Sequence, residues 1–115
     1  MLVVAMFKNN FGKLLVYAPA AHRKRLRSVR TATEETAKLL NLDYEVVRFG
    51  NDFSPIYVYY ECGDGGEPIP LYCDEGKAGT LQEIGAALRN MMFVLSFHPK
   101  HSALRQVRSA IISLS

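Results

Sequence analysis

Apolar residues occur along the chain both in short continuous runs and in longer stretches with helical spacing. We predict strands in the short runs, which cover residues 1–7, 13–18, 44–49, 56–62 and 68–73. Asn9, Asn10 and Gly12 separate the first two runs and tolerate positive φ, so we predict a β-hairpin there. Both faces of this hairpin are apolar, which predicts a central position in a sheet.

Three longer stretches place apolar residues on one side of a helix. The first extends from Ala20 to about Asn41. Its apolar arc consists of Leu26, Val29, Thr33, Thr36, Ala37 and Leu40. The second begins after Thr80, which has the spacing of a capping box with Glu83, and Pro99 ends it. The third begins near Ser102 and directs Leu104, Val107 and Ile111 inward.

The predicted elements follow the order strand, strand, helix, three strands and two helices. Because short connections favour antiparallel neighbours, we predict a single α+β domain over residues 1–115, with helices packed on a five-stranded, mostly antiparallel sheet. This order resembles that of profilin-like, longin-like and roadblock-like domains, in which the first hairpin and a later three-strand meander close into one sheet. The resemblance implies a scaffold that binds proteins or small ligands.

A thioredoxin-like arrangement is the alternative, because Pro55 precedes a strand-strand-helix unit. The redox cysteine pair of that family would lie at the start of the first helix. This chain has APAAHR there, in residues 18–23, and its two cysteines are Cys62 and Cys73. The alternative therefore implies the fold of that family without its chemistry.

The composition of residues 63–66, GDGG, predicts a hairpin between the strands that flank it. Residues opposite one another then have numbers that add to about 129 or 130, which places Cys62 and Cys73 about 20 Å apart along the strands. A disulfide needs Cα atoms within about 7 Å. We therefore predict that both cysteines are thiols.

Residues 22–30, HRKRLRSVR, are densely basic in a chain whose net charge is only +3. The basic residues of this stretch, all in the predicted first helix, are Arg23, Lys24, Arg25, Arg27 and Arg30. Basic residues at a helix N-terminus oppose the helix dipole, at a cost of about 0.3 to 1 kcal/mol each. An acidic partner or a bound anion would compensate for this cost. The alternative is a solvated helix face without a partner.

Arg25 lies at the border between the apolar and polar sides of this helix. It either extends to solvent or reaches a carboxylate on a neighbouring element, for which Asp43 and Glu45 are the candidates.

The segment of residues 49–76 contains no Lys or Arg and several acidic residues, and tyrosines gather on its predicted hairpin. Because tyrosine is enriched at protein interfaces, we predict a second binding surface, which consists of Tyr57, Tyr59, Glu61, Asp64 and Glu67. Ordinary packing of half-buried tyrosines is the alternative.

The chain contains no pattern that specifies a reaction. His98 and His101 lack further ligands at the spacing of a zinc site. The glycines of residues 63–66 join two strands, whereas a phosphate loop joins a strand to a helix. Hydrophobic and charged fractions of 49% and 22% are typical of a globular domain, and no apolar run approaches the roughly 20 residues of a membrane span. We expect no catalytic residues, no metal and no cofactor.

We therefore expect a small cytoplasmic, non-enzymatic protein-interaction or regulatory domain that forms homo-oligomers or binds another protein. The first alternative is a nucleic-acid-binding protein that uses the basic helix, although such proteins are more often basic throughout. A small enzyme or ligand-binding protein is the second alternative.

Overall fold

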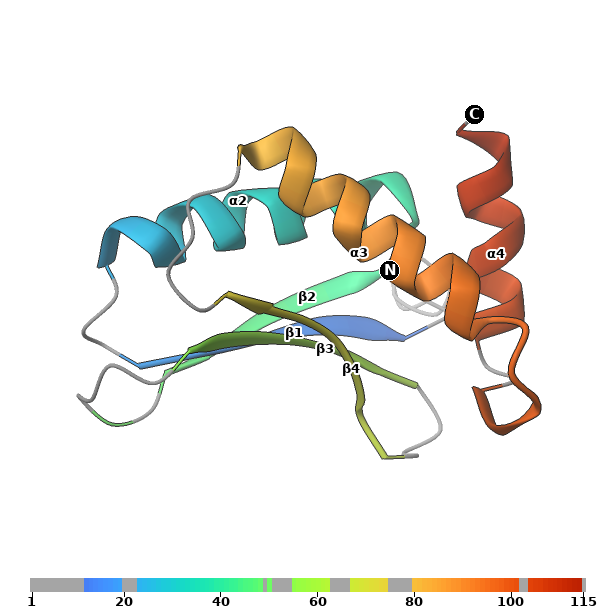
Figure 1. The fold of residues 1–115 in the computed structure, drawn as a ribbon, viewed down its shortest axis with the longest axis horizontal. Coiled ribbons are helices and arrows are strands. Elements are labelled where there is room, and N and C mark those ends of the chain that lie inside the picture. The colour runs from blue at the N-terminus through green and yellow to red at the C-terminus, as the bar shows by residue number, and fades with distance from the viewer. Residues whose placement is uncertain are drawn as a thin grey trace, which may run out of the picture.

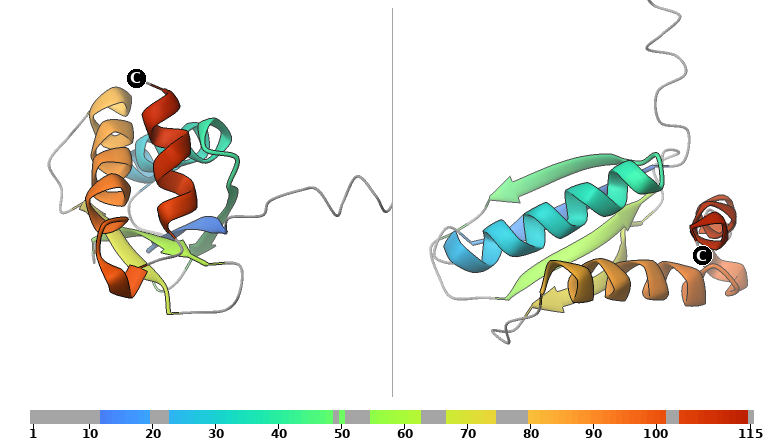
Figure 2. Two further views of the ribbon diagram at one scale, coloured as in Figure 1. Left: turned by 90° about the vertical axis from the view of Figure 1, so that its right-hand side faces the viewer. Right: turned by 90° about the horizontal axis from the view of Figure 1, so that it is seen from above.

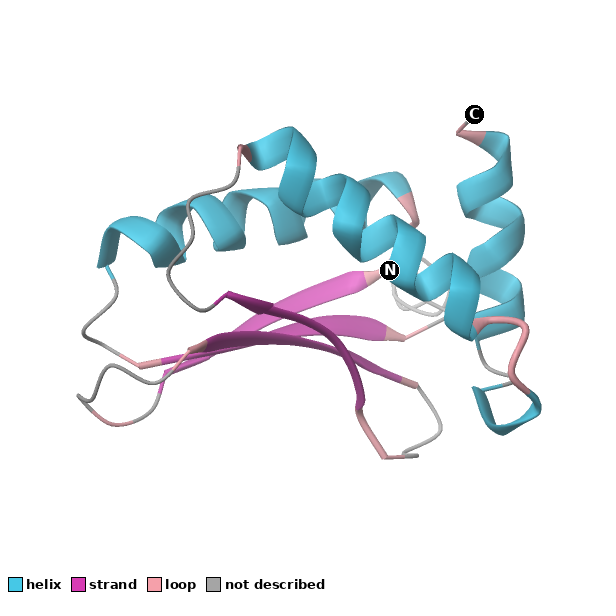
Figure 3. Cartoon of the chain, in the orientation of Figure 1, coloured by secondary structure: helices cyan, strands magenta, loops and turns pink. Residues whose placement is uncertain are grey.

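The computed structural model of the chain describes residues 12–19, 23–48, 50, 55–62, 67–74, 80–101 and 104–114. Its strands are β1 (Lys13–Ala18), β2 (Asp43–Arg48), β3 (Ile56–Glu61) and β4 (Ile69–Asp74). Its helices are α2 (Arg23–Leu39), α3 (Leu81–Leu95) and α4 (Leu104–Ser113), with a short 3-10 turn at Pro99–His101. These elements form two layers, with α2 and α3 on one face of the sheet (Figure 1 and Figure 3).

The described sheet has the strand order β2-β1-β3-β4. β1 pairs parallel with β2 and antiparallel with β3, and β3 pairs antiparallel with β4. α2 carries the chain back across the sheet between β1 and β2 (Figure 2), so these two strands run in the same direction. The α+β class is confirmed. The prediction of five strands is wrong, because the described sheet has four. This sheet is mixed, with two antiparallel pairings and one parallel pairing.

The predicted hairpin between residues 1–7 and β1 is also wrong. Both sides of β1 are occupied, one by β2 and the other by β3, so neither side is open to a hairpin partner. Residues 1–7 themselves lie outside the described part of the chain. β2 does not join β3 in a meander either, because the crossover through α2 places it on the other side of β1. The profilin-, longin- or roadblock-like topology depends on both features and does not describe this chain.

The hairpin of β3 and β4 has the predicted register. Tyr57 lies opposite Cys73, numbers that add to 130, and Tyr60 lies opposite Ile69, numbers that add to 129. The difference of one arises from a bulge, where the register shifts between Val58 and Tyr59. Both cysteines are thiols, as predicted. β3, β4 and α3 form the strand-strand-helix unit that was expected after Pro55.

The first predicted helix is present as α2. Every residue of its predicted apolar arc is buried. Thr33 and Thr36 tolerate burial because their hydroxyls donate to backbone oxygens one turn earlier, at 2.7 Å and 2.8 Å. Asn41 ends the helix with a φ of 59°, and the Leu42 N–H donates to the carbonyl of Ala37 at 2.8 Å. This is a Schellman motif, with Asn41 in the position that requires a left-handed backbone.

The second and third predicted helices are present as α3 and α4. The capping box of α3 is confirmed, since Thr80 accepts from the Glu83 N–H at 3.1 Å and the Thr80 N–H donates to the Glu83 carboxylate at 2.8 Å. In α4, Leu104 and Val107 are fully buried and Ile111 is partly buried.

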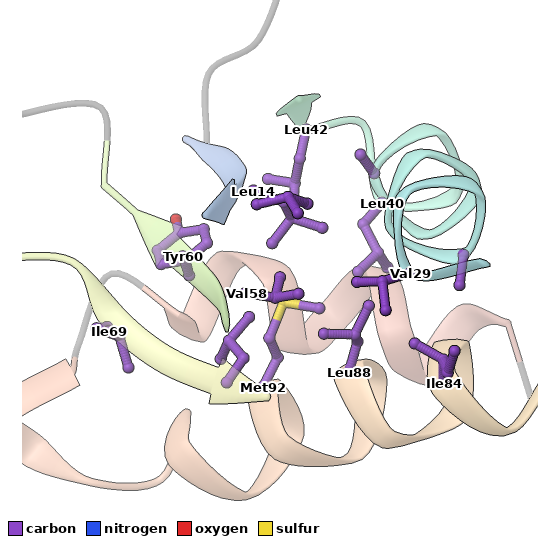
Figure 4. Packing of buried hydrophobic residues seen from close by; sticks show 14 of the residues in the cluster. Leu14, Val29, Leu40, Leu42, Val58, Tyr60, Ile69, Ile84, Leu88 and Met92 are labelled. Atoms are coloured by element: carbon purple, nitrogen blue, oxygen red, sulfur yellow. The ribbon is translucent and has the colours of Figure 1, made fainter. Parts of the chain in front are cut away.

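The core lies between the sheet and the helix layer (Figure 4). Its central side chains have no exposed surface, and they are Leu14, Val58 and Tyr60 from the sheet, Val29 and Leu40 from α2, and Leu88 and Met92 from α3. The core therefore occupies one face of the sheet, and the opposite face is covered by no helix or strand that the structure describes (Figure 1).

Candidate functional site

A groove of about 520 Å³ follows the outer side of α2, next to the edge strand β2. Its lining consists of Leu26, Arg27, Arg30, Thr31 and Glu34 from α2 and Arg48 from β2. Arg27, Arg30 and Arg48 are exposed. This arginine groove therefore gathers three guanidinium groups around a single carboxylate.

The positions of the groove residues follow from the two elements that carry them. Helical spacing places Arg27, Arg30 and Glu34 on one side of α2. In β2, Tyr44 and Val46 pack against the core from the helix-facing side, and strand alternation places Arg48 on the same side. Sequence reasoning missed Arg48. The order strand, helix, strand in the sequence could have indicated its place, because this unit brings the helix-facing side of β2 next to α2.

Tyr44 lies where the groove meets the core. Its hydroxyl is buried and has no hydrogen-bond partner among the described residues. Burial raises the pKa of Tyr44, the nearby Arg30 guanidinium opposes this rise, and the Glu34 carboxylate adds to it. The charges of Arg30 and Glu34 therefore both act on this hydroxyl, in opposite directions.

Arg25 lies outside the groove. Its Nη2 donates to Asp74 Oδ1 at 2.5 Å, and the Asp74 side chain is only 5% exposed. Its carboxylate partner is thus on β4, and neither Asp43 nor Glu45, the two candidates from the sequence, takes this role. The ion pair links the start of α2 to the edge strand opposite β2.

The charges of α2 are unevenly distributed along its length. Its first turn contains Arg23, Lys24 and Arg25 and no acidic residue, which is unfavourable beside the positive end of the helix dipole. Both acidic residues of α2, Glu34 and Glu35, are in its second half. The helix therefore has a basic first half and a more acidic second half.

The sheet face opposite the helices carries an aromatic cluster, which we call the tyrosine face. The ring of Tyr59 lies 5.3 Å from that of Tyr17 and 6.3 Å from that of Tyr57, measured between centroids. The three tyrosines and Pro68 line a hollow of about 310 Å³. Leu15, opposite Tyr59 in the ladder, is only 4% exposed. The apolar centre of this face is therefore already covered within the chain.

Acidic side chains lie beside the tyrosine face. Lys13 donates to Glu45 at 2.8 Å and lies 3.7 Å from Glu61, and the hydrogen bond to Glu45 raises the pKa of Lys13. Glu67 is exposed at the hairpin, and Asp64 lies outside the described residues. Tyr57, Tyr59 and Glu61, predicted as one surface, do share this face. It lies on the opposite side of the sheet from the arginine groove, so the two predicted surfaces do not meet within one chain.

A third exposed surface lies at the end of α3. Val94 and Phe97 are 63% and 60% exposed. Phe97 packs edge-on against Phe93, with ring centroids 5.1 Å apart, and the Arg108 guanidinium lies 4.2 Å from the Phe97 ring centroid. This helix-end patch is mainly apolar, and none of its residues lines the arginine groove.

The potential ligand side chains do not gather into a metal site within the described residues, where no three His, Cys, Asp or Glu side chains form a group. The rings of His98 and His101 lie 5.4 Å apart, and His98 Nδ1 accepts from the Lys100 N–H at 3.0 Å. These two histidines therefore belong to the turn between α3 and α4. None of the described helices is both long and apolar enough to cross a bilayer.

The chain has also been compared with known proteins. It matches no protein-family model, no curated protein and no solved structure.

Proposed function

We propose that this chain is a small protein-interaction domain that associates with itself through the arginine groove and the neighbouring edge of β2. The observation that carries the proposal is the convergence of Arg27, Arg30 and Arg48 in an exposed groove beside a strand edge. Three cations around one carboxylate repel one another and attract negative charge, which a second copy can supply through Glu34 and Glu35 of its α2.

The first half of α2 supports the same conclusion. Its basic residues lie near the positive end of the helix dipole, where each costs about 0.3 to 1 kcal/mol. Of these residues, Arg25 is already paired with Asp74 within the chain. Exposed pairs along the helix, such as Glu34 and Lys38 at 3.8 Å, return only about 0.2 to 0.5 kcal/mol. An acidic surface on a partner would offset the remaining cost.

Nucleic acid could also supply negative charge, and it is the second candidate. Proteins that bind single strands combine a basic groove with aromatic side chains on which the bases stack. In this chain the tyrosine face lies on the far side of the sheet from the arginine groove, and Glu45 and Glu61 flank it. The separation of basic and aromatic surfaces favours a protein partner. A reducing compartment such as the cytoplasm suits the two thiols, Cys62 and Cys73.

Sedimentation velocity of the wild type and of the variant Arg27→Glu with Arg30→Glu tests this function. We expect the wild type to be larger than one chain and the variant to be monomeric. The control is Lys100→Glu with Arg105→Glu, which makes the same charge change at exposed positions outside the groove and should keep the wild-type size. Circular dichroism checks that the groove variant is folded.

The same variants separate the two candidate partners. Nucleic-acid binding predicts retention on an oligonucleotide column that falls steeply with salt, and less steeply in the groove variant. Self-association predicts a change of size without this difference in salt dependence. A wild type that stays monomeric at every concentration would refute the proposed function.

A further inference from the structure

We propose that two copies of this chain pair through the outer edges of β2, antiparallel about a two-fold axis perpendicular to the sheet, with Val46 facing Val46 of the partner subunit. The inference rests on the proposed function, because it specifies the partner and the geometry of that self-association. The two four-stranded sheets would then continue into one another, with all helices on the same side.

The two edges of the sheet differ in their capacity to pair. β4 contains Pro70, which lacks an N–H, and the bulge interrupts its ladder with β3. Both features block the addition of another strand. β2 pairs with β1 over all six of its residues without a bulge and contains no proline. No described element lies beyond its outer edge (Figure 2), so β2 is the edge that can accept a strand.

The alternation of side chains restricts the register. Opposite residues of antiparallel strands point to the same face, and the axis keeps the helix layers on one side. Residues of the same face therefore meet, and each allowed register sets one residue of β2 opposite its own copy. The registers centred on Glu45 and on Val46 pair the most residues of β2. The first register sets like charges against each other, which is unfavourable. The second sets two half-buried valines together.

In the Val46 register, Tyr44 lies opposite the partner's Arg48 on the helix-facing side. Glu34 lines the arginine groove on this same side of β2. The partner's Arg48 therefore comes within reach of both the Tyr44 ring and the Glu34 carboxylate. The two-fold axis produces this contact twice.

The charge order of α2 fits the same arrangement. The two-fold axis is perpendicular to the sheet, so it places α2 antiparallel to its copy. The two copies of α2 come next to each other because α2 lies on the β2 side of the sheet (Figure 2). The basic first half of each helix then faces the second half of the other, which contains Glu34 and Glu35. The charge order that is unfavourable in one chain becomes complementary in the pair.

Two charge-reversal variants test the proposed contact, Arg48→Glu and Glu34→Arg. Each variant alone sets like charges against each other at both copies of the contact, and its dimer should weaken by about tenfold or more. An equimolar mixture restores opposite charges at both contacts. At one contact the two substituted side chains, one from each variant, form a reversed ion pair, and at the other the wild-type pair remains. We expect both variants to be monomeric alone and dimeric when mixed, by sedimentation velocity.

The outcomes of this experiment are distinguishable. A contact between Arg48 and Glu34 within one chain would not respond to mixing, so a mixture that stays monomeric overturns the inference. Variants that keep the wild-type size also overturn it, while self-association stands. In that case the variant Val94→Asp is measured next. If it reduces the oligomer to a monomer, the helix-end patch is the interface. A monomeric wild type refutes the inference and the proposed function together.

Disulfide cross-linking tests the register independently. In a background with Cys62→Ser and Cys73→Ser, Val46→Cys places two thiols opposite each other, and mild oxidation should give a covalent dimer. Thr80→Cys, exposed at the start of α3, is the matched control and should stay monomeric. Faster cross-linking of Glu45→Cys than of Val46→Cys would show that the proposed register is wrong.

Discussion

The two edge strands of the sheet are held in different ways. β4 is fastened to the helix layer by the ion pair of Arg25 with the nearly buried Asp74, and Pro70 blocks its outer edge. On β2, Glu45 and Arg48 are exposed, and the ion pair of Glu45 with Lys13 has side chains that are 51% and 34% exposed. One edge is therefore closed by interactions within the chain, whereas the other remains available to a partner. Natural sheets close their edges in this way to avoid unwanted pairing. An edge that is left open therefore favours pairing with a partner.

The largest expected effect lies at the closed edge. Asp74→Ala leaves the Arg25 guanidinium without its carboxylate partner in a mostly buried position, and we expect the free energy of unfolding to fall by about 3 kcal/mol. Glu45→Ala breaks an exposed pair and should cost less than about 1 kcal/mol. Urea unfolding of both variants measures the difference. Equal losses would contradict the distinction between the two edges.

A double variant shows whether the charge or the packing of this pair matters. Arg25→Met with Asp74→Leu replaces the ion pair by apolar side chains and removes the unpaired charge. It should recover most of the stability that Asp74→Ala loses, because buried ion pairs are often replaceable by apolar residues. A double variant as unstable as Asp74→Ala would show that the loss is one of packing.

A smaller effect on stability is expected from two tyrosines on the edge strands, Tyr44 on β2 and Tyr72 on β4. Burial raises the pKa of Tyr44 and of Tyr72, and the Asp74 carboxylate adds to the rise at Tyr72. The unfolded chain therefore loses these protons first, and stability is complete below about pH 10 and declines as the pH rises above it. Tyr44→Phe should make this alkaline decline shallower.

Tyr44→Phe also removes a buried hydroxyl that has no hydrogen-bond partner among the described residues. We therefore expect the free energy of unfolding at pH 7 to rise by about 1 kcal/mol. Thermal melts from pH 7 to pH 11, in the Arg48→Glu background to suppress association, measure both effects. Tyr72→Phe is the control at the closed edge and should change the alkaline decline in the same direction. A lower stability of Tyr44→Phe at pH 7 would show that its hydroxyl is satisfied.

Local patterns in the sequence predicted local structure well. The apolar arc of α2, the capping box of Thr80 with Glu83 and the register of the hairpin of β3 and β4 each depend on residues close together in the chain, and each is present. The pairing of β1 was missed because a strand that is apolar on both faces suits any central position. Its neighbours are decided by the crossover of α2, which returns the chain parallel to β1.

The candidate site was predictable only in part, for a similar reason. The exposed arginines of α2 follow from helical periodicity. Arg48 joins them only through the parallel pairing of β1 with β2. The partner of Arg25 is 49 residues away in the sequence, and its choice depends on the packing of α2 over the whole sheet. Such contacts lie beyond any periodic pattern.

The smallest expected effect concerns the turn that leads into the open edge. Asn41 has a φ of 59° and ends α2 immediately before β2, and Leu42 is buried behind it. Glycine adopts this conformation without a Cβ penalty, so Asn41→Gly should raise the free energy of unfolding by about 0.5 kcal/mol. Asn41→Ala should lower it by about 1 kcal/mol, because alanine is disfavoured in the left-handed region. Neither change touches the arginine groove, so the dimer affinity should stay the same. An altered affinity would show that this turn sets the position of the open edge as well as the end of the helix.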